Sequence, residues 1–166
     1  RPTLLKAVVL NDVGPVVEPL GLIRIKSYVG KMPAPRNWAE AIDIVKATMS
    51  AHFTDISEQD WDGYARRTFE EKDGKFVGRS DPKLANTLAE IGPDMPRIEL
   101  WPQFEAMAQV PTLAIRGENS DLLSAETLEE MTRRCPKCES WVVPGQGHAP
   151  LLSDTATIER IKTFVD

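Results

Sequence analysis

The sequence has 166 residues, of which 42% are hydrophobic and 27% are charged, and it carries a formal net charge of −5. This composition is typical of a globular chain that is long enough for one ordinary hydrophobic core. The acidic balance and the scattered basic residues argue against nucleic acid and anionic membrane surfaces as partners, and no run approaches the ~18 apolar residues of a membrane-spanning helix.

The first segment, residues 1–15, is predicted to be a core strand followed by a loop. An apolar run from Leu4 to Leu10 ends at Asn11 and Asp12, before Gly14 and Pro15 stop the strand. Open α/β sheets place ligand groups at the carboxyl ends of their strands. Asn11 is therefore a candidate substrate-pocket residue and Asp12 a candidate acid, although a turn Asp that bonds nearby backbone amides is the alternative for Asp12.

The second segment, residues 16–108, is predicted to be mostly helical. Apolar residues recur at helical spacing, and two stretches begin with capping signals, at Asn37 and at Ser57 with Asp60 three residues later. The turn at 72–75 indicates a small hairpin. Five large side chains of this segment are candidates for the wall of a substrate pocket, with burial in a helix-helix core as the alternative for each. They are Trp38, Met49, Trp61, Trp101 and Phe104.

The third segment, residues 109–166, is predicted to alternate strands and helices. Pro111–Arg116 has the continuous apolar character of a parallel strand that is covered on both faces. A helix is expected over Ala125–Arg134 and a further strand over Ser140–Val143. This pattern indicates an α/β fold with parallel strands.

Two loops of this third segment carry a lone acid and a lone histidine. Asp121 follows the strand that Gly117 ends, and His148 lies in the turn Gly145-Gln146-Gly147-His148, 27 residues later. That spacing allows one helix and one strand between two loops on the same edge of a parallel sheet. An orienting acid and a general base are two thirds of a catalytic triad.

These loops resemble the C-terminal half of an α/β hydrolase. The acid loop matches at 116–124, the histidine loop matches at 145–150, and residues 7–15 resemble the strand that follows the nucleophile helix. The resemblance implies the C-terminal part of an α/β-hydrolase sheet, in which helices flank parallel strands. It also implies that the helical segment is a cap, or lid, inserted between the sixth and seventh strands.

The resemblance further implies roles for individual residues. His148 would be the general base and Asp121 the acid that orients it, because Asp121 matches the motif of the acid loop. Asp12 is the alternative acid, since some branches of the family take the acid from the earlier strand. The substrate would be a small molecule, and the default reaction is hydrolysis of a carboxylic ester.

The nucleophile that the family requires is absent from this sequence. The family's chain order is Ser, acid, His, with the Ser in G-x-S-x-G, and that motif does not occur here. We therefore expect a fragment that is inactive alone and that needs an N-terminal half of the same hydrolase, whether cleaved from it or separately encoded. An Asp nucleophile would make the protein an epoxide hydrolase or a dehalogenase, and a non-catalytic ligand-binding relative is a further alternative.

The remaining chemistry-bearing residues predict no metal site and no cofactor. Cys135 and Cys138 form a C-x-x-C pair, but zinc prefers four ligands, and only His52 and His148 supply further nitrogen donors. Two thiols beside a turn, in a reducing compartment, are the simpler interpretation. A cytoplasmic location is expected on that basis.

Overall fold

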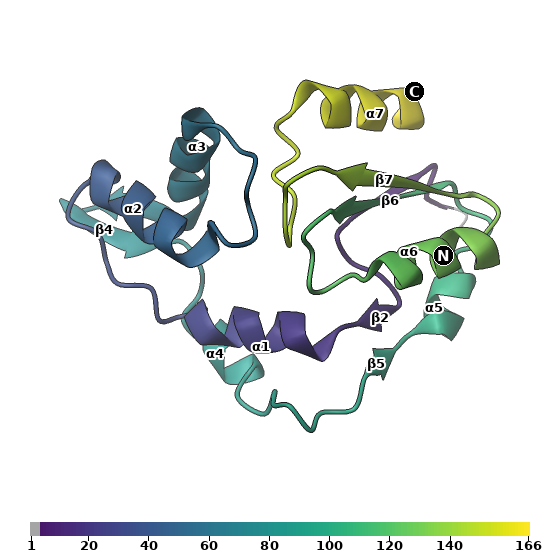
Figure 1. Cartoon of the computed structure of the whole chain (residues 1–166), viewed down its shortest axis with the longest axis horizontal. Coiled ribbons are helices and arrows are strands. Elements are labelled where there is room, and N and C mark those ends of the chain that lie inside the picture. Colours follow the sequence, from purple (N-terminus) through teal and green to yellow (C-terminus); the bar gives the residue numbers. More distant parts are fainter. Residues whose placement is uncertain (1–3) are drawn as a thin grey trace.

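The computed structural model describes residues 4–166, which form seven helices and seven strands (Figure 1). The helices are α1 (Pro19–Tyr28), α2 (Trp38–Met49), α3 (Glu58–Thr68), α4 (Leu84–Thr87), α5 (Trp101–Glu105), α6 (Ala125–Arg134) and α7 (Thr155–Val165). The strands are β1 (Val8–Asn11), β2 (Val16–Val17), β3 (Phe69–Lys72), β4 (Lys75–Gly78), β5 (Ile98–Glu99), β6 (Thr112–Gly117) and β7 (Cys138–Val143). None of the helices in this described range is long and apolar enough to cross a membrane.

One lobe of the molecule, which we call the sheet lobe, contains a parallel sheet in the order β1-β6-β7 together with α5, α6 and α7. In register, Asn11 of β1 lies beside Ile115 of β6, and Ile115 lies beside Trp141 of β7. Helix α6 covers one face of the sheet and α7 covers the other (Figure 1). The α/β class with flanking helices, predicted from the sequence, is confirmed.

The central strand β6 is buried on both faces. Leu113 and Ile115 are fully buried and pack with Ile161 and Phe164 of α7. Ala114, which points to the other face, packs with Leu128 and Met131 of α6. Because both faces of β6 are covered, the strand is continuously apolar, as the sequence pattern predicted.

The second lobe, which we call the helical lobe, comprises α1 to α4 with the β3-β4 hairpin. Its core is a cluster of apolar side chains from α2, α3 and β3 in which Val45, Met49 and Phe69 are buried. Both predicted caps are confirmed. Asn37 accepts a hydrogen bond from the Glu40 amide, and Ser57 forms a capping box with Asp60.

Several elements differ from the sequence prediction. β1 begins at Val8 rather than at Leu4, because the ladder with β6 starts there. β7 begins at Cys138, two residues before the predicted start. The apolar residues Leu84, Leu88 and Ile91 have helical spacing after Pro82, but only α4 forms there. None of the α4 side chains is buried, and a four-residue helix without packing gains little stability.

A short antiparallel pair, β2 with β5, was not predicted from the sequence. Val16 pairs with Glu99, and Val17 pairs with Ile98. Each strand has only two residues, so neither shows an alternating pattern that sequence reasoning could detect. The pair brings the two ends of the long helical segment together beside the sheet lobe (Figure 1).

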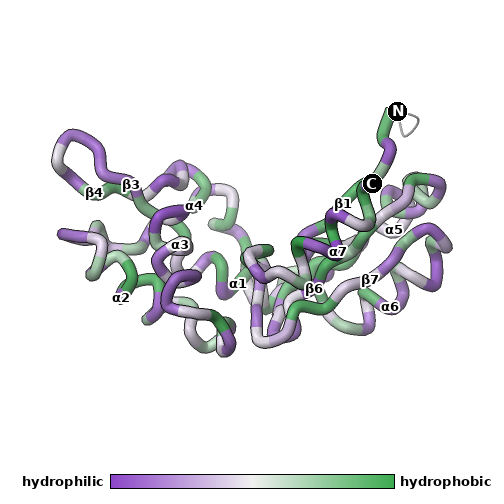
Figure 2. Tube along the Cα trace, turned by 90° about the horizontal axis from the view of Figure 1, so that it is seen from above, coloured by the Kyte–Doolittle hydropathy of each residue, from purple (hydrophilic) through white to green (hydrophobic). Residues whose placement is uncertain are grey.

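The two lobes lie side by side, and α1 is the part of the helical lobe that borders the sheet lobe (Figure 2). Backbone groups connect the segment after α2 to the loops of the sheet lobe. The Thr54 amide donates to the Gly145 carbonyl at 2.8 Å, and the Asn119 side-chain amide donates to the His52 carbonyl at 3.1 Å. Leu151, just after the histidine loop, packs against the core of the helical lobe.

Gly117 allows the close approach of the acid loop and the histidine loop. A Cβ atom at this position would lie 2.4 Å from the Gln146 carbonyl oxygen and 2.6 Å from that of Gly147. We predict that Gly117→Ala lowers the free energy of unfolding by about 1–3 kcal/mol, because backbone cannot yield as a side chain can. Urea denaturation measures the change. Gly78→Ala is the control, since its Cβ would meet no atom within 4 Å, and equal effects of the two substitutions would contradict the prediction.

Candidate active site

Three loops meet at the carboxyl ends of the three parallel strands. Asp12 follows β1, the acid loop (116–124) continues from the end of β6, and the histidine loop (145–150) follows β7. Parallel neighbouring strands end at the same edge of a sheet, so side chains from these loops can converge there. The structure brings together two of the residues expected from the sequence, Asp12 and His148.

The carboxylate of Asp12 is fully buried and has three hydrogen-bond donors. The Gly117 amide donates to Oδ1 at 2.7 Å, and the Ser120 hydroxyl donates to Oδ2 at 2.6 Å. Oδ2 also lies 2.8 Å from Nδ1 of His148. The backbone of Asp12 has φ +57°, a left-handed conformation that Asp tolerates better than most residues. This conformation occurs at the turn out of β1, where the side chain meets the other two loops.

The contact with Asp12 determines which nitrogen of His148 carries the proton. Nδ1 also lies 3.1 Å from the Asp12 carbonyl oxygen, which can only accept, so these contacts favour the tautomer in which Nδ1 carries the proton and Nε2 has a free lone pair. Asn11 and Gln146 support the loop, since Asn11 Nδ2 donates to the Pro150 carbonyl at 3.1 Å and Gln146 Oε1 accepts from the Leu151 amide at 2.8 Å. Asn11 therefore contacts the histidine loop. These contacts fix the orientation of the His148 ring.

Asp121 does not contact His148, contrary to the pairing that the sequence motif suggested. Its two carboxylate oxygens accept hydrogen bonds from Nε and Nη2 of Arg24 on α1, at 2.6 and 2.8 Å. The Ser120 amide donates to the Gly117 carbonyl, so the chain turns between Gly117 and Ser120, and Ser120 rather than Asp121 meets Asp12. Asp121 instead attaches the acid loop to α1.

The Arg24–Asp121 pair is electrostatically favourable although it is partly buried. Burial opposes the charged form of Asp121, but the hydrogen bonds and charge of Arg24 outweigh burial and hold the pKa of Asp121 below its usual range. His52 acts in the same direction. Arg24 correspondingly has a raised pKa, because Asp121 outweighs its own burial. The bridge is a charged contact between the helical lobe and the acid loop.

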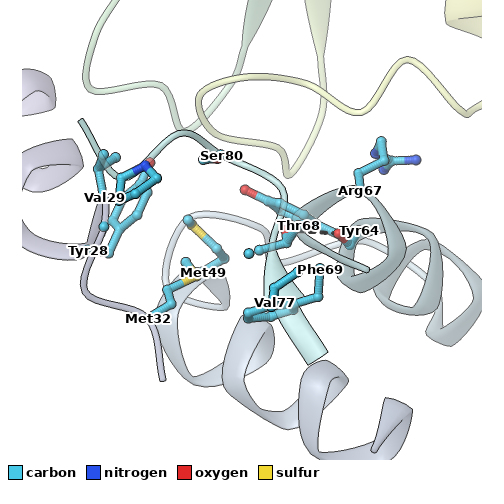
Figure 3. A pocket seen from close by; sticks show the side chains of 13 residues that line it. Tyr28, Val29, Met32, Met49, Tyr64, Arg67, Thr68, Phe69, Val77 and Ser80 are labelled. Carbon is cyan, nitrogen blue, oxygen red and sulfur yellow. Dashed lines mark hydrogen bonds between the residues drawn. The ribbon is translucent and has the colours of Figure 1, made fainter. Parts of the chain in front are cut away.

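A cavity of about 580 Å³ lies in the helical lobe, between the end of α1, α2, α3 and the β3-β4 hairpin. Met49 is the one predicted pocket residue that lines it (Figure 3). Trp61 and Phe104 are buried in the cores of the two lobes. Trp38 packs edge-on against Phe76, and Trp101 lies beneath the guanidinium of Arg134 in the sheet lobe.

Sequence reasoning missed the polar residues of this cavity. Tyr28, Tyr64 and Arg67 line it, together with apolar side chains that include Met32 and Phe69. Tyr64 and Arg67 are three residues apart on α3, a spacing that places them on one helical face but says nothing of a cavity. Ser120 was also missed as a partner of Asp12. No local pattern identifies a hydroxyl that contacts a residue 108 positions away.

The structure offers no metal site among residues 4–166, where no group of three or more His, Cys, Asp and Glu side chains could hold an ion. Cys135 and Cys138 are buried and free. Burial raises the pKa of both thiols, that of Cys138 to about 11. Both are therefore protonated and unreactive at neutral pH.

Comparison with known proteins identifies the fold. No protein-family model matches the sequence. The crystal structure of an α/β hydrolase from Novosphingobium aromaticivorans matches with a TM-score of 0.88 and 35% identity, over 99% of this chain and 58% of that one. The chain folds as the C-terminal portion of an α/β hydrolase. The resemblance inferred from the two loops is thereby confirmed.

Two curated relatives of this chain are named hydrolases. A 3-hydroxybutyrate-oligomer hydrolase of Cupriavidus necator is 33% identical over 96% of this chain and 56% of its own length. A 2-(acetamidomethylene)succinate hydrolase of Mesorhizobium japonicum is 28% identical over 99% of this chain and 57% of its own length. The chain thus spans little more than half the length of these relatives.

The Arg24–Asp121 bridge predicts how the stability of this chain depends on pH. Asp121 has a folded pKa below its unfolded value of about 3.9, so its contribution is fully present above that value and is lost as the pH falls through the folded pKa. We predict that Asp121→Asn loses about 1–3 kcal/mol of unfolding free energy at pH 7, and less at pH 3.

Urea denaturation at pH 7 and at pH 3 measures both values. Asp94→Asn is the matched control, since Asp94 is exposed and makes no side-chain hydrogen bond or ion pair within residues 4–166. If the two variants lose the same unfolding free energy at both pH values, the bridge does not stabilise the fold.

Proposed function

We propose that the whole protein is an α/β hydrolase that cleaves carboxylic esters with a Ser-Asp-His triad, in which Asp12 is the acid and His148 the base. The observation that carries this proposal is the 2.8 Å contact between Asp12 Oδ2 and His148 Nδ1 at the carboxyl ends of β1 and β7. It is the relation between acid and base that a triad needs. The fold and the named relatives support a hydrolase.

The geometry of the pair suggests how each residue would act. Nε2 of His148 takes the proton of the nucleophilic hydroxyl as it attacks the ester carbonyl, and returns it to the leaving alcohol. Asp12 keeps Nδ1 protonated and stabilises the imidazolium that forms. In the second half of the reaction, the same nitrogen takes a proton from the water that hydrolyses the acyl-enzyme. The amide of Gly117 and the hydroxyl of Ser120 keep Asp12 in place throughout.

The nucleophile and the amides that stabilise the oxyanion are proposed to come from a part of the protein outside this sequence. Two features support this. The sequence has no G-x-S-x-G, and the side of β1 away from β6 pairs with no strand among residues 4–166. In an α/β hydrolase the nucleophile turn follows an earlier strand of the same sheet. Strands from the N-terminal half would therefore extend the sheet at β1 and place the nucleophile near His148.

The name of one relative supports esters rather than amides as the substrates of this protein. The Cupriavidus necator protein is named a hydrolase of 3-hydroxybutyrate oligomers, and hydroxy acids join to one another through ester bonds. A small-molecule ester is therefore the substrate class to test first. Simple 4-nitrophenyl esters are suitable, because release of 4-nitrophenolate is followed directly by absorbance.

We predict that His148→Ala in the whole protein reduces kcat for a 4-nitrophenyl ester by about 10³-fold or more, because the nucleophile then has no base. The circular dichroism spectrum and the urea midpoint should change little, since the imidazole is partly exposed and its loss leaves room for water. Turnover equal to that of the unchanged protein would rule out His148 as the base.

The choice of acid is tested by a matched pair of substitutions. We predict that Asp12→Asn lowers kcat by about 10⁴-fold, the effect of the corresponding change in serine proteases, because the amide favours the wrong tautomer of His148. Asp121→Asn should reduce kcat by less than about tenfold, since Asp121 bonds Arg24 instead. If Asp121→Asn gives the larger loss, the acid assignment is reversed.

A further inference from the structure

Glu118 of the acid loop holds the start of the turn that delivers His148. The Glu118 amide donates to the Val143 carbonyl at 2.9 Å, which extends the contacts between β6 and β7 by one residue beyond their last paired positions. The Glu118 side chain reaches further along the same loop, because its Oε2 accepts a hydrogen bond from the Gly145 amide at 2.7 Å. The exit from β7 is therefore bound to the acid loop through both the backbone and the side chain of Glu118.

Gly145 is also held from the side of the helical lobe. Its carbonyl accepts hydrogen bonds from the amide and the hydroxyl of Thr54, at 2.8 and 3.4 Å. The approach is close, because a Cβ atom at Gly145 would lie 2.5 Å from Cβ of Asp55. Gly145 has φ +62°, a left-handed conformation that glycine adopts without strain. The N–H and C=O of this one residue thus bind two different parts of the molecule, Glu118 of the acid loop and Thr54 of the helical lobe.

Asn119, the next residue of the acid loop, joins the same parts of the molecule. Its amide donates to the Gln146 carbonyl at 2.9 Å. Its side chain donates to the His52 carbonyl and to the Thr54 hydroxyl, at 3.1 and 3.2 Å. A Cβ atom at Gly147 would lie 2.7 Å from Cβ of His52. The segment between α2 and α3 therefore lies against both glycines of the histidine loop, and the acid loop binds it there.

Three consecutive side chains of the acid loop thus support three different parts of the candidate site. Glu118 binds the histidine loop, Asn119 binds the helical lobe, and Ser120 binds the carboxylate of Asp12. The contact with Asp12 orients the ring of His148, but the backbone that carries this ring must be placed by other bonds. The bond from Glu118 lies only three residues before the histidine. A displacement of about 1 Å at a reacting group can cost about 10²-fold in rate.

We propose that Glu118 is a positioning residue for the reaction, which acts through Gly145 to place His148 beside Asp12. Within residues 4–166 its carboxylate forms no hydrogen bond with Asp12 or with the imidazole, so its effect passes through the histidine loop. The role belongs to the accepted hydrogen bond and not to the negative charge. This inference rests on the proposed function, because that function makes His148 the base.

Kinetics of the whole protein with a 4-nitrophenyl ester test this role. Glu118→Ala should lower kcat by about 10–100-fold and change KM by less than about threefold, because the base is displaced while substrate binding is kept. Glu118→Gln should keep kcat within about threefold of that of the unchanged protein, since its Oε1 can still accept from the Gly145 amide. Glu129→Ala is the matched control, because Glu129 is exposed on α6 and its carboxylate makes no hydrogen bond or ion pair in the described range.

Proton NMR of the whole protein gives a readout that does not depend on turnover. The Nδ1 proton between His148 and Asp12 should give a low-field resonance, which is identified by its loss in His148→Ala. In Glu118→Ala this resonance should shift and its proton should exchange faster with water, because the ring is held less firmly. In Glu118→Gln and in Glu129→Ala the resonance should stay unchanged. Urea midpoints show that the compared variants are folded.

An unchanged kcat in Glu118→Ala would overturn the proposal. A lowered kcat with an unchanged resonance would also overturn it, since Glu118 would then not act through His148. Equal losses in Glu118→Ala and Glu118→Gln would assign the effect to the charge and contradict the role of the hydrogen bond. If the unchanged protein hydrolyses no ester, the proposed reaction fails, and the resonance alone then decides whether Glu118 positions His148.

Discussion

The bond between His148 and the buried carboxylate of Asp12 depends on all three strands of the parallel sheet. Asp12 comes from the end of β1, its other hydrogen-bond donors come from the loop after β6, and His148 comes from the loop after β7. A buried carboxylate is tolerated only when its oxygens are hydrogen-bonded. The close approach of the second and third loops at Gly117 is therefore a requirement of the site, since any side chain there would separate them.

A second carboxylate, that of Asp121, connects the acid loop to the helical lobe. Asp121 is the residue that best matched the family's acid motif, yet its partner is Arg24 of α1. Of the two acids on neighbouring loops, Asp12 therefore contacts the histidine and Asp121 contacts the helical lobe. The difference arises from the turn at Gly117–Ser120, which directs Ser120 toward Asp12 and Asp121 toward α1.

The helical lobe combines a packed core with a cavity at one side of it. Of the aromatic and methionine side chains expected to face substrate, Trp61 and Phe104 are buried in cores, and Met49 alone reaches the cavity. The polar residues that distinguish the cavity, Tyr28, Tyr64 and Arg67, come from the ends of α1 and α3.

Local patterns in the sequence determined the elements and the two loops. The apolar run of β6, the caps at Asn37 and Ser57 and the Gly-x-Gly-His turn each act over a few neighbouring residues, so they could be predicted without a structure. The sequence also named Asp12 and Asp121 as the two candidate acids. The sequence does not show which of these two carboxylates lies beside the histidine.

Only the tertiary structure shows which of the two carboxylates contacts His148, and only the tertiary structure locates the cavity. Asp12 is 136 positions from His148, and Arg24 is 97 positions from Asp121. Patterns among neighbouring residues therefore cannot predict either contact. The strand pair β2-β5 was missed for the same reason. The contacts of these residues are set by how the lobes and loops pack, because a side chain's partner depends on the whole fold, whereas its helix or strand depends mainly on its neighbours in sequence.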